Sequence, residues 1–306
     1  MKQNLVIGTR ASKLALWQAE HIAGLIRRQH PAVTVELKHV VTTGDKILDV
    51  PLANIGGKGL FTKELEVAML QGDIDLAVHS LKDMPTELPE GLMLAAITER
   101  HDPGDALVST KYKSFTELPQ GARVGTSSLR RKAQLLHARP DLVIESLRGN
   151  LDTRLRKLDE GHFDAIILAA AGLKRLGWEE RIAEILPESL CLPAVGQGAL
   201  AIESRQGDEA VNSLLAFLHD EPTYQAIAAE RAFLARVEGG CQVPVGVKGT
   251  LGDSELLLEA VIASLDGKTV IRRKVTGTTA APEKLGVLLA EEMLAAGGAE
   301  ILSAIE

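Results

Sequence analysis

The sequence predicts an α/β fold in two parts, followed by a separate α+β domain. Strand-like apolar runs alternate with segments of helical period through the first two thirds of the 306 residues, a pattern typical of α/β units around mostly parallel sheets. Two of these runs end in Gly-Thr, at Gly8 and at Gly125, and each leads into a helix candidate through a segment that contains serine. From about Pro222 the alternation stops.

Apolar periodicity gives the expected elements in chain order. Before residue 100 we expect strands at 5–8, 33–41, 75–79 and 92–97 and helices at 12–28 and 63–70. A turn-forming run at 101–104 then marks a break near Pro103. Beyond it we expect strands at 123–126, 142–145 and 165–169 and helices at 129–138 and 151–159. The C-terminal part is expected to hold a helix from about 222, strands at 243–251, 256–264 and 269–276, and a helix from 282.

The two Gly-Thr turns predict a site for anions between the α/β parts. A helix N-terminus offers unpaired backbone N–H groups and a partial positive charge, which suits carboxylates or phosphates. Two such helix starts across a cleft would form an anion-binding slot, with Arg10 beside the first and Arg130 and Arg131 beside the second. Serine and threonine are also ordinary helix caps, and that alternative stays open.

Basic residues are concentrated in one stretch of an acidic protein. Between residues 121 and 157 nine Lys or Arg stand against three Asp or Glu, a net charge of +6, so the rest of a chain of net charge −7 carries −13. A compact basic stretch without Phe, Tyr or Trp favours a small anionic ligand over nucleic acid, which usually needs a broad basic surface and stacking platforms. Solvated helix faces, the alternative, are expected for Arg139, Arg156 and Lys157.

Composition limits the remaining classes. With 45% hydrophobic and 25% charged residues, the chain is typical of a soluble globular protein, with two or three domains at about 150 residues each. No apolar run is long enough to span a membrane and no signal segment is seen, so we expect a cytoplasmic protein. Two cysteines, without His or Cys at metal-ligand spacing, predict neither a disulfide framework nor a zinc or iron site.

Two residues are candidates for the chemistry. Cys241 follows Gly239 and Gly240, which remove side-chain bulk and let another molecule approach the thiol, as at an attachment point. The alternative is a small buried cysteine in a turn, since free cysteine mostly packs as a hydrophobe. Asp83 lies in a loop after a buried strand, the usual place for catalytic groups in parallel α/β folds, or it is an ordinary turn aspartate.

Two further segments are less specific. We expect His79, in the strand before Asp83, to be structural. The run 56–59, Gly-Gly-Lys-Gly, lacks the spacing and the Ser or Thr of a phosphate-binding P-loop, so a nucleotide site is not expected. We interpret it as a mobile lid over the cleft, with a plain surface turn as the alternative.

Eight motifs, taken in order, resemble one family, porphobilinogen deaminase, also called hydroxymethylbilane synthase. The motifs in the first lobe are GTRASKLAL at 8–16, GGKGLF at 56–61 and VHSLKDMP at 78–85. Those that follow are GTSSLRR at 125–131, LRGN at 147–150, GLKRL at 172–176, PAVGQG at 193–198 and EGGC at 238–241. Any one motif would be weak, but eight in sequence are highly specific, and no motif position departs from the family's pattern.

The resemblance implies an architecture. It implies two similar α/β lobes, like those of periplasmic binding proteins, around a cleft, and a C-terminal α+β domain that carries Cys241. It also implies that the chain crosses back to the first lobe after Gly198, which periodicity alone does not show. The expected domains are lobe 1 from 1–99 with 200–217, lobe 2 from 105–193, and the C-terminal domain from 222–306.

The resemblance also implies an activity, that of a transferase of tetrapyrrole biosynthesis. Family members join four porphobilinogen molecules head to tail, with release of ammonia, on a dipyrromethane cofactor held by a thioether. They then hydrolyse off the linear tetrapyrrole hydroxymethylbilane. The family's attachment cysteine matches Cys241, and Cys191 lies outside every motif. The catalytic aspartate matches Asp83, whose carboxylate would stabilise positive charge on the pyrrole and relay a proton.

Cationic and polar residues suit the acetate and propionate groups that each pyrrole carries. On the family's pattern the cofactor- and substrate-binding residues are Arg10, Ser12, Lys82, Thr126, Ser127, Ser128, Arg130, Arg131, Arg148, Arg154, Arg175, Gln197 and Gly198. Lys58 and Phe61 belong to the lid, and no residue is assigned to a metal.

The expected partner is the small-molecule substrate porphobilinogen, with neither nucleic acid nor a membrane, and the expected state is a monomer. Two α/β lobes around an anion slot also describe solute-binding proteins and regulator effector domains. Those usually need an export signal or a DNA-binding segment, and the sequence shows neither. An inactive homologue is disfavoured because Asp83 and Cys241 are both present. The branch of tetrapyrrole synthesis that uses the product, whether haem, sirohaem or cobalamin, stays open.

Overall fold

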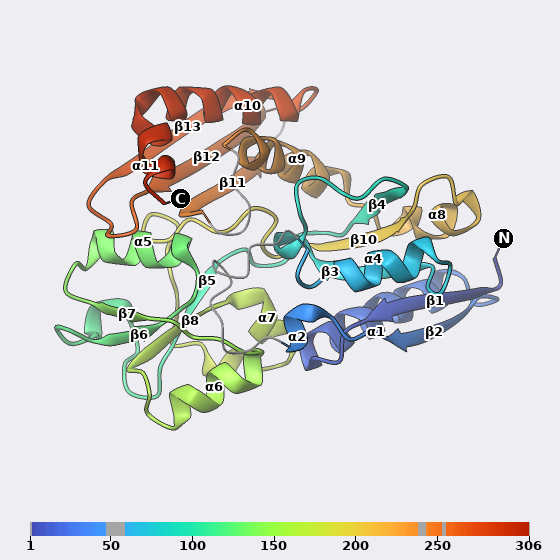
Figure 1. The fold of residues 1–306 in the computed structure, drawn as a ribbon, viewed down its shortest axis with the longest axis horizontal. Helices are drawn as coiled ribbons and strands as arrows, with labels where there is room; N and C mark the ends of the chain where they lie inside the picture. Colours follow the sequence, from blue (N-terminus) through green and yellow to red (C-terminus); the bar gives the residue numbers. More distant parts are fainter. Residues whose placement is uncertain (1, 47–58, 238–242, 253–254, 306) are drawn as a thin grey trace.

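The computed structural model describes residues 2–46, 59–237, 243–252 and 255–305 (Figure 1). The elements in these residues form two five-stranded sheets and one three-stranded sheet. Figure 1 shows the first lobe at the right, the second lobe in green at the lower left, and the C-terminal domain in orange and red above the second lobe. Among the described residues, no helix is both long and apolar enough to cross a membrane.

The first five-stranded sheet takes one of its strands from much later in the chain. Its order is β2-β1-β3-β10-β4. The strands are β1 Asn4–Thr9, β2 Thr34–His39, β3 Leu76–Ser80, β4 Leu92–Ile97 and β10 Leu200–Arg205. β1 pairs in parallel with β2 and β3, whereas β10 runs antiparallel to β3 and β4. The helices of this lobe are α1 Lys13–Gln29, α2 Thr43–Lys46, α4 Lys63–Leu70 and α8 Glu209–Leu215.

Helix α1 shows why the chain folds in this way. Ser12 is its N-cap, and buried side chains recur at helical spacing at Ala19, Ile22, Ala23 and Ile26. This stripe packs in one apolar core with residues of β1, β2, β3 and β10. Full burial of a single Ile or Leu side chain stabilises the fold by about 1.5–3 kcal/mol, so the stripe fixes which face of α1 meets the sheet.

The second five-stranded sheet repeats this arrangement. Its order is β7-β6-β8-β5-β9. The strands are β5 Asp105–Val108, β6 Arg123–Gly125, β7 Val143–Glu145, β8 Ala165–Ala169 and β9 Glu184–Ile185. β6 pairs in parallel with β7 and β8, and β5 runs antiparallel to β8 and β9. The helices are α5 Leu129–Ala138, α6 Leu151–Asp159 and α7 Ala170–Arg175. In both sheets the fourth strand is therefore the reversed one.

The reversed strand of each sheet is supplied by the chain as it arrives from the other lobe. β5 follows β4 and β10 follows β9, so the chain crosses twice, through residues 98–104 and 186–199. In the first crossing Arg100 forms an ion pair of 2.5 Å with Glu230, which lies in α9 (Glu221–Arg236). Glu230 also accepts the Gly196 N–H of the second crossing at 2.8 Å. Helix α9 thus holds both crossings together.

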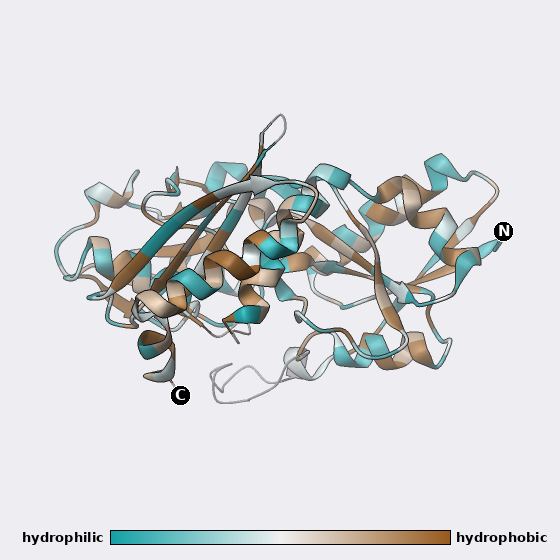
Figure 2. Ribbon diagram, turned by 90° about the horizontal axis from the view of Figure 1, so that it is seen from above, coloured by the Kyte–Doolittle hydropathy of each residue, from teal (hydrophilic) through white to brown (hydrophobic). Residues whose placement is uncertain are grey.

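The C-terminal domain is an antiparallel sheet covered by helices. The strands, in the order β11-β12-β13, are β11 Val245–Leu251, β12 Glu255–Ala263 and β13 Val270–Thr278. The helices besides α9 are α10 Pro282–Met293 and α11 Ala299–Ser303. A Cβ added at Gly286 would lie 2.2 Å from the backbone oxygen of Ala229, so this glycine lets α10 approach α9 closely. Figure 2 shows hydrophobic and hydrophilic bands along the helices, as expected where one face is buried.

The predicted fold class is confirmed, because two similar α/β lobes and a C-terminal α+β domain are present. The predicted strands and helices have counterparts within a few residues. The pattern missed β5, β9, β10, α2, α7 and α8, mainly because short buried runs carry no period. We keep the domain boundaries, 1–99 with 200–217, 105–193 and 222–306, as a proposal that the assignment of strands to the three sheets supports.

Candidate functional site

Helices α1 and α5 begin in the same way, beyond the carboxyl ends of β1 and β6. The Ser12 Oγ accepts the Ala15 N–H at 3.3 Å, and the Ser128 Oγ accepts the Arg131 N–H at 3.4 Å. Thr126 is buried, and its Oγ1 accepts the Ser128 N–H at 3.2 Å. Both helix starts are thus capped by their own serines, so the similarity of the two lobes in sequence is matched by a similarity in geometry.

Lys82 and Asp83 lie in a single 3₁₀ turn directly after the end of β3. Lys82 is half-buried and Asp83 is exposed. Burial lowers the pKa of Lys82 to about 8, and the adjacent Asp83 carboxylate opposes this shift. Arg131 and Arg130 lower the pKa of Lys82 further, and Asp105 raises it. This loop of lobe 1 therefore faces charged groups of lobe 2.

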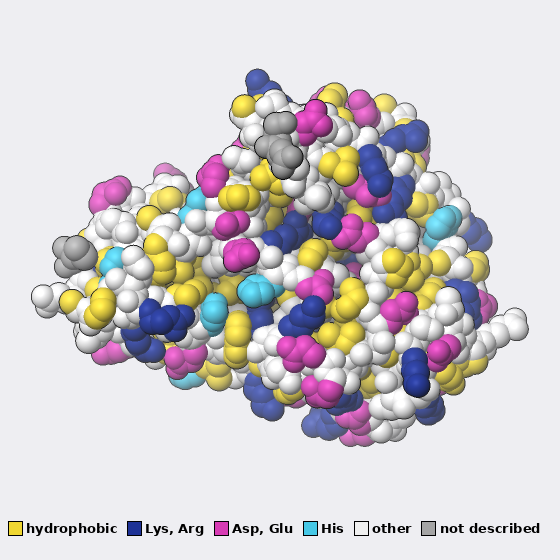
Figure 3. All heavy atoms as spheres, turned by 180° about the vertical axis from the view of Figure 1, so that it is seen from behind, with side chains coloured by type: hydrophobic (Ala, Val, Ile, Leu, Met, Phe, Trp, Pro, Cys, Tyr) yellow, Lys and Arg dark blue, Asp and Glu magenta, His cyan; other side chains and the backbone are white. Residues whose placement is uncertain are grey.

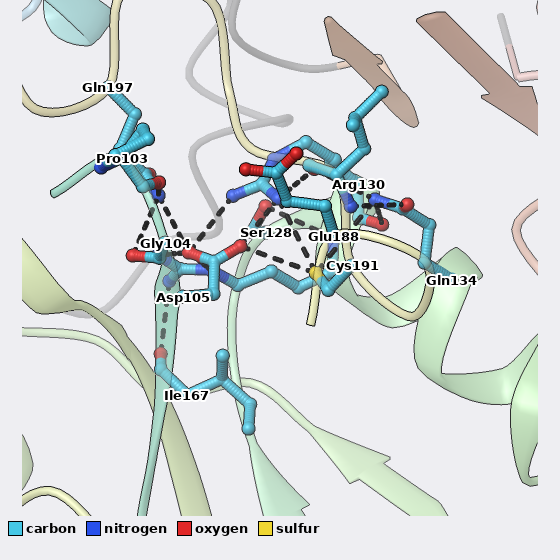
Figure 4. Close-up of polar contacts among 12 residues, drawn as sticks. Pro103, Gly104, Asp105, Ser128, Arg130, Gln134, Ile167, Glu188, Cys191 and Gln197 are labelled. Atoms are coloured by element: carbon cyan, nitrogen blue, oxygen red, sulfur yellow. Dashed lines mark hydrogen bonds and ion pairs between the residues drawn. The ribbon is translucent and has the colours of Figure 1, made fainter. Parts of the chain in front are cut away.

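Asp105, the first residue of β5, lies completely buried at the centre of a polar cluster (Figure 4). Its Oδ2 lies 2.6 Å from the Arg130 Nη1, and its Oδ1 lies 2.6 Å from the Arg131 Nη2. The Gln197 Nε2 donates to Oδ1 at 2.9 Å. Burial alone would raise the pKa of Asp105, but the Arg130 and Arg131 guanidinium groups hold it well below its usual range. Asp105 is therefore an anion that pairs with both arginines.

Cys191 belongs to the same cluster. Its Sγ donates to the Asp105 Oδ2 at 3.2 Å and lies 3.5 Å from the Arg130 Nη1. Burial raises the pKa of the Cys191 thiol to about 12, and the Asp105 carboxylate adds to the shift. A buried thiol that stays protonated at neutral pH is a poor nucleophile, so Cys191 has a structural role.

The loop between β7 and α6 brings more cations to the same side of lobe 2. Ser127 ties this loop to the start of α5, since its Oγ donates to the Leu147 backbone oxygen at 2.9 Å. Arg148 is half-buried in the loop, and the Arg154 Nε donates to the Gly149 backbone oxygen at 2.7 Å. Burial lowers the pKa of Arg154 to about 10, and charges on both lobes, among them Asp83, also act on it.

The second crossing contributes Gln197 and Gly198. Gly198 has a φ of +99°, and an added Cβ would lie 2.5 Å from the His101 backbone oxygen, so only glycine fits there. The Arg175 Nη2 donates to the Gly198 backbone oxygen at 2.7 Å, and burial lowers the pKa of Arg175 to about 10. In the part of the chain that the structure describes, the buried Arg175 Nε has no acceptor. An unused donor on a buried cation suits an anionic ligand group.

A cavity lies at the carboxyl ends of β1 and β3, on the side of lobe 1. Arg10, Ser12, Phe61 and Asp83 line it together with Gln18. The Arg10 guanidinium carbon lies 4.2 Å from the centroid of the Phe61 ring, within the range of a cation–π contact. Phe61 thus places the end of the predicted lid motif at this cavity.

The structure brings most of the predicted residues to one region. Asp83, Arg130 and Arg131 act electrostatically on Lys82. Asp83 and Arg131 also act on Arg154, and Asp83 lines the cavity beside Arg10. Lys58 and Cys241 lie outside the described residues. Within the described ranges, no group of three or more His, Cys, Asp or Glu could hold a metal ion.

Two polar residues of this region were missed in the sequence. Gln18 is buried in α1, and its Nε2 donates to the Ser80 Oγ at 2.8 Å. The signal in the sequence that could have identified it was an amide on the apolar face of a predicted helix. Asp105 was missed because it directly follows a turn-forming run that only marked a break. His79, expected to be structural, lies 3.0 Å from the buried Glu203 Oε2 through its Nε2.

Comparison with known families covers nearly the whole described chain. The family model of the porphobilinogen deaminase dipyromethane cofactor binding domain matches residues 5–213. The model of the porphobilinogen deaminase C-terminal domain matches residues 224–295.

Curated relatives named porphobilinogen deaminase are similar over almost their full length. The relative from Geotalea daltonii is 55% identical over 303 residues, which are 99% of this chain and 95% of that protein. The relative from Trichlorobacter lovleyi is 56% identical over 300 residues, 98% and 96% of the two chains. The relative from Desulforamulus reducens is 52% identical over 305 residues, 100% and 99% of the two chains.

Solved structures with a similar fold include two binding proteins. A periplasmic substrate-binding protein of an ABC transporter from Coxiella burnetii has a TM-score of 0.46 and 15% identity, over 74% of this chain and 96% of that chain. A nutrient-binding protein from Burkholderia cenocepacia bound to methionine has a TM-score of 0.44 and 16% identity, over 76% and 95%.

The family matches carry the activity with them: a transferase of tetrapyrrole biosynthesis that joins porphobilinogen molecules and uses a dipyrromethane cofactor. They also decide against the alternatives of a solute-binding protein and of a regulator effector domain. The chain belongs to the porphobilinogen deaminase family.

Proposed function

We propose that porphobilinogen units are joined in the cleft between the α/β lobes, with Asp83 as the catalytic carboxylate and Cys241 as the attachment point of the cofactor. The observation that supports this most directly is the loop with Lys82 and Asp83, which faces Arg130 and Arg131 of the other lobe. A substrate with two carboxylates would there meet cations from both lobes while its pyrrole lies near the carboxylate of Asp83.

The residues of the cleft fit a dipyrromethane. When bound, this group supplies the pyrrole to which the first unit is joined, and its acetate and propionate groups need cationic partners. The buried Nε of Arg175, which has no acceptor in the described part, is one such donor. Guanidinium groups suit these partners because they bind carboxylates with two parallel hydrogen bonds. The residues that we propose for cofactor and substrate binding are Arg10, Ser12, Lys82, Thr126, Ser127, Ser128, Arg130, Arg131, Arg148, Arg154, Arg175, Gln197 and Gly198.

Asp83 is proposed to act on the charge that develops during the reaction. Departure of ammonia from a porphobilinogen unit leaves positive charge on its pyrrole, and a carboxylate beside the pyrrole nitrogen stabilises that charge. The same carboxylate can relay the proton that is released when the new carbon–carbon bond is complete. Its exposed position at the rim of the cavity, on the lobe opposite most of the cations, supports both roles.

Cys241 is supported as the attachment point by the state of the other cysteine. Cys191 is 1% exposed, and its raised pKa keeps it protonated, so it has neither access nor a thiolate. Intact-mass spectrometry tests this: purified protein should exceed the sequence mass by one dipyrromethane. Cys241→Ser should lose the adduct and Cys191→Ser should keep it, whereas an adduct on Cys191 would contradict the assignment.

We also propose a lid formed by residues 56–61, with Lys58 and Phe61, and supported by the contact of Phe61 with Arg10. For the whole protein we propose a cytoplasmic monomer that binds no nucleic acid. Figure 3 supports the last point for one face of the molecule, on which Lys and Arg are interspersed with Asp and Glu instead of forming one basic field.

A further inference from the structure

We propose that Asp105 is a positioning residue for the reaction: its buried carboxylate fixes the Arg130 and Arg131 guanidinium groups and balances part of the positive charge beside Lys82. Asp105 is completely buried, so it acts through these side chains and not on a substrate. The inference rests on the proposed function, because that function gives the two arginines and Lys82 the task of holding carboxylates.

Arg130 and Arg131 occupy an unfavourable place for cations. They lie two and three residues after Ser128, the N-cap of α5, where the helix dipole is positive and backbone N–H groups are unpaired. The two residues are only 4% and 5% exposed, so water cannot offset their charge. A buried charge is stable only when it is paired, and the carboxylate of Asp105 supplies the pair for both.

The contacts of Asp105 fix the plane of each guanidinium. It meets Arg130 through Nη1 at 2.6 Å and Nη2 at 3.3 Å, and Arg131 through Nη2 at 2.6 Å and Nε at 3.0 Å. Backbone oxygens of Leu192 and Ile167 accept one further hydrogen bond each, at 2.6 and 3.0 Å. A guanidinium has five N–H groups. Within the described residues three of the five are bound to oxygen, so two per arginine remain for a ligand.

Asp105 also limits the positive charge that acts on Lys82. Among the described residues, the charged groups that act on Lys82 include Asp83 on its own loop, Asp105 on β5, and Arg130 and Arg131 on α5. Two guanidinium cations against one buried carboxylate leave a net charge of +1 on the cluster of Asp105, Arg130 and Arg131. Without the carboxylate that charge becomes +2, and the protonated form of Lys82 becomes less favourable. Since burial already lowers the pKa of Lys82 to about 8, a further decrease would remove its charge near neutral pH.

The test compares full-length wild-type protein with Asp105→Asn, which keeps the shape of the side chain and removes its charge. The pH dependence of Lys82 acetylation by acetic anhydride, followed by peptide mass spectrometry, gives the titration of Lys82 without any need for activity. We expect its midpoint to lie at lower pH in Asp105→Asn. We also expect the fraction of protein that carries the cofactor to fall, on the order of 10²-fold, because two buried cations lose their partner. An unchanged Lys82 midpoint in folded Asp105→Asn would overturn the inference.

A second variant keeps the test decisive where Asp105→Asn does not fold. Asp105→Asn with Arg130→Gln removes one cation together with the carboxylate, so the net charge of the cluster stays at +1. We expect the Lys82 midpoint to return toward the wild-type value, while cofactor loading stays low because Arg131 has lost its anchor. A midpoint that stays low, or full loading without Asp105, would contradict the inference.

Asp141 provides a matched control in the same lobe. Its carboxylate lies 2.7 Å from Arg139 near the surface, outside the cluster. Asp141→Asn should change neither the Lys82 midpoint nor the cofactor content, and a shift equal to that of Asp105→Asn would show a general charge effect and overturn the inference. Wild-type protein without any adduct would instead contradict the proposed function, and the Lys82 titration would still decide the role of Asp105.

Discussion

The two α/β lobes share one topology but build their helix starts from opposite kinds of residue. In lobe 1 the second and third residues after the serine cap of α1 are Leu14 and Ala15. In lobe 2 the same positions after the cap of α5 are Arg130 and Arg131. The first lobe thus offers apolar side chains at the place where the second lobe offers two buried cations.

The reversed strands, β10 in lobe 1 and β5 in lobe 2, differ in the same way: the first residue is apolar in lobe 1 and charged in lobe 2. Leu200, the first residue of β10, pairs with Ser80 at the end of β3, and Asp105, the first residue of β5, pairs with Ala169 at the end of β8. Leu200 belongs to the apolar core of its lobe, whereas Asp105 binds the arginines. A change of residue type at two neighbouring elements therefore turns a packed helix start into a charged one, and the fold stays the same.

The largest effect is expected where the lobe 2 cations are replaced by a residue of the lobe 1 type. Arg130→Leu or Arg131→Leu breaks a buried ion pair, at a cost of about 3–5 kcal/mol, and leaves cofactor carboxylates with one partner fewer. Cofactor content by intact mass and the melting temperature should both fall.

Arg156 is the matched control for the arginine variants. Its side chain is 68% exposed on α6, 3.7 Å from Glu160, so Arg156→Leu should be close to neutral. Equal losses of cofactor content in the variants at positions 130, 131 and 156 would show that the cleft has been placed wrongly. They would also show that the lobes do not differ in the way proposed here.

The next largest effect concerns the carboxylate of lobe 1. After β3 the chain has Lys82 and Asp83, whereas the corresponding residues after β8 are Ala171 and Gly172, so only lobe 1 places a carboxylate there. Asp83→Asn keeps the shape but removes the charge, and turnover should fall by about 10²-fold or more. Asp83→Glu should retain part of the activity.

Asp73 is the control for Asp83, since it is an exposed aspartate of the same lobe that lies 3.4 Å from Lys38. Asp73→Asn should leave turnover unchanged. Cofactor content must be measured separately from turnover in each variant. Near-normal turnover by folded, cofactor-loaded Asp83→Asn would remove Asp83 from the mechanism.

A smaller effect is expected from pH, through Lys82, a lysine of lobe 1 that faces the arginines of lobe 2. Because burial lowers the pKa of Lys82 to about 8, the side chain is a cation below that pH and becomes neutral above it. Carboxylate binding should therefore weaken as pH rises through 8, with KM for porphobilinogen rising by up to about tenfold per pH unit. Lys82→Arg, which stays charged, should abolish this rise, and an identical rise in that variant would exclude Lys82 as its cause.

The features common to both lobes are predicted better from the sequence than the features in which the lobes differ. Strand and helix periodicity, together with the serine after each Gly-Thr, is a local signal, and the structure places β1, α1, β6 and α5 where it indicated. The apolar pattern did not identify β5 and β10, because they are short buried runs and the strands they pair with lie far away in the chain. Their reversed direction follows from sheet pairing and from no local signal.

The role of Asp105 shows the same limit at the level of the site. Its partners Arg130, Arg131 and Gln197 are 25, 26 and 92 residues further along the chain. The motifs that resemble the family contain all three partners, but Asp105 lies in none of them. Only the folded arrangement shows that one carboxylate pairs with two arginines. The role of Cys241 stays a prediction, because that residue lies outside the described ranges.

The smallest effect tests whether the helix starts are as equivalent as the topology indicates. Ser12 and Ser128 accept the N–H groups of Ala15 and Arg131 at 3.3 and 3.4 Å, so the two caps should contribute equally, about 1 kcal/mol each. In Ser12→Ala and Ser128→Ala, native-state hydrogen exchange at the Ala15 and Arg131 amides should then be about fivefold faster, by the same factor in both lobes. A clearly larger increase at Arg131 would show that the buried arginines make the start of α5 depend more on its cap than the start of α1. The two lobes would then be equivalent in backbone geometry but not in stability, because the buried arginines that lobe 2 provides for its ligand would also destabilise the start of α5.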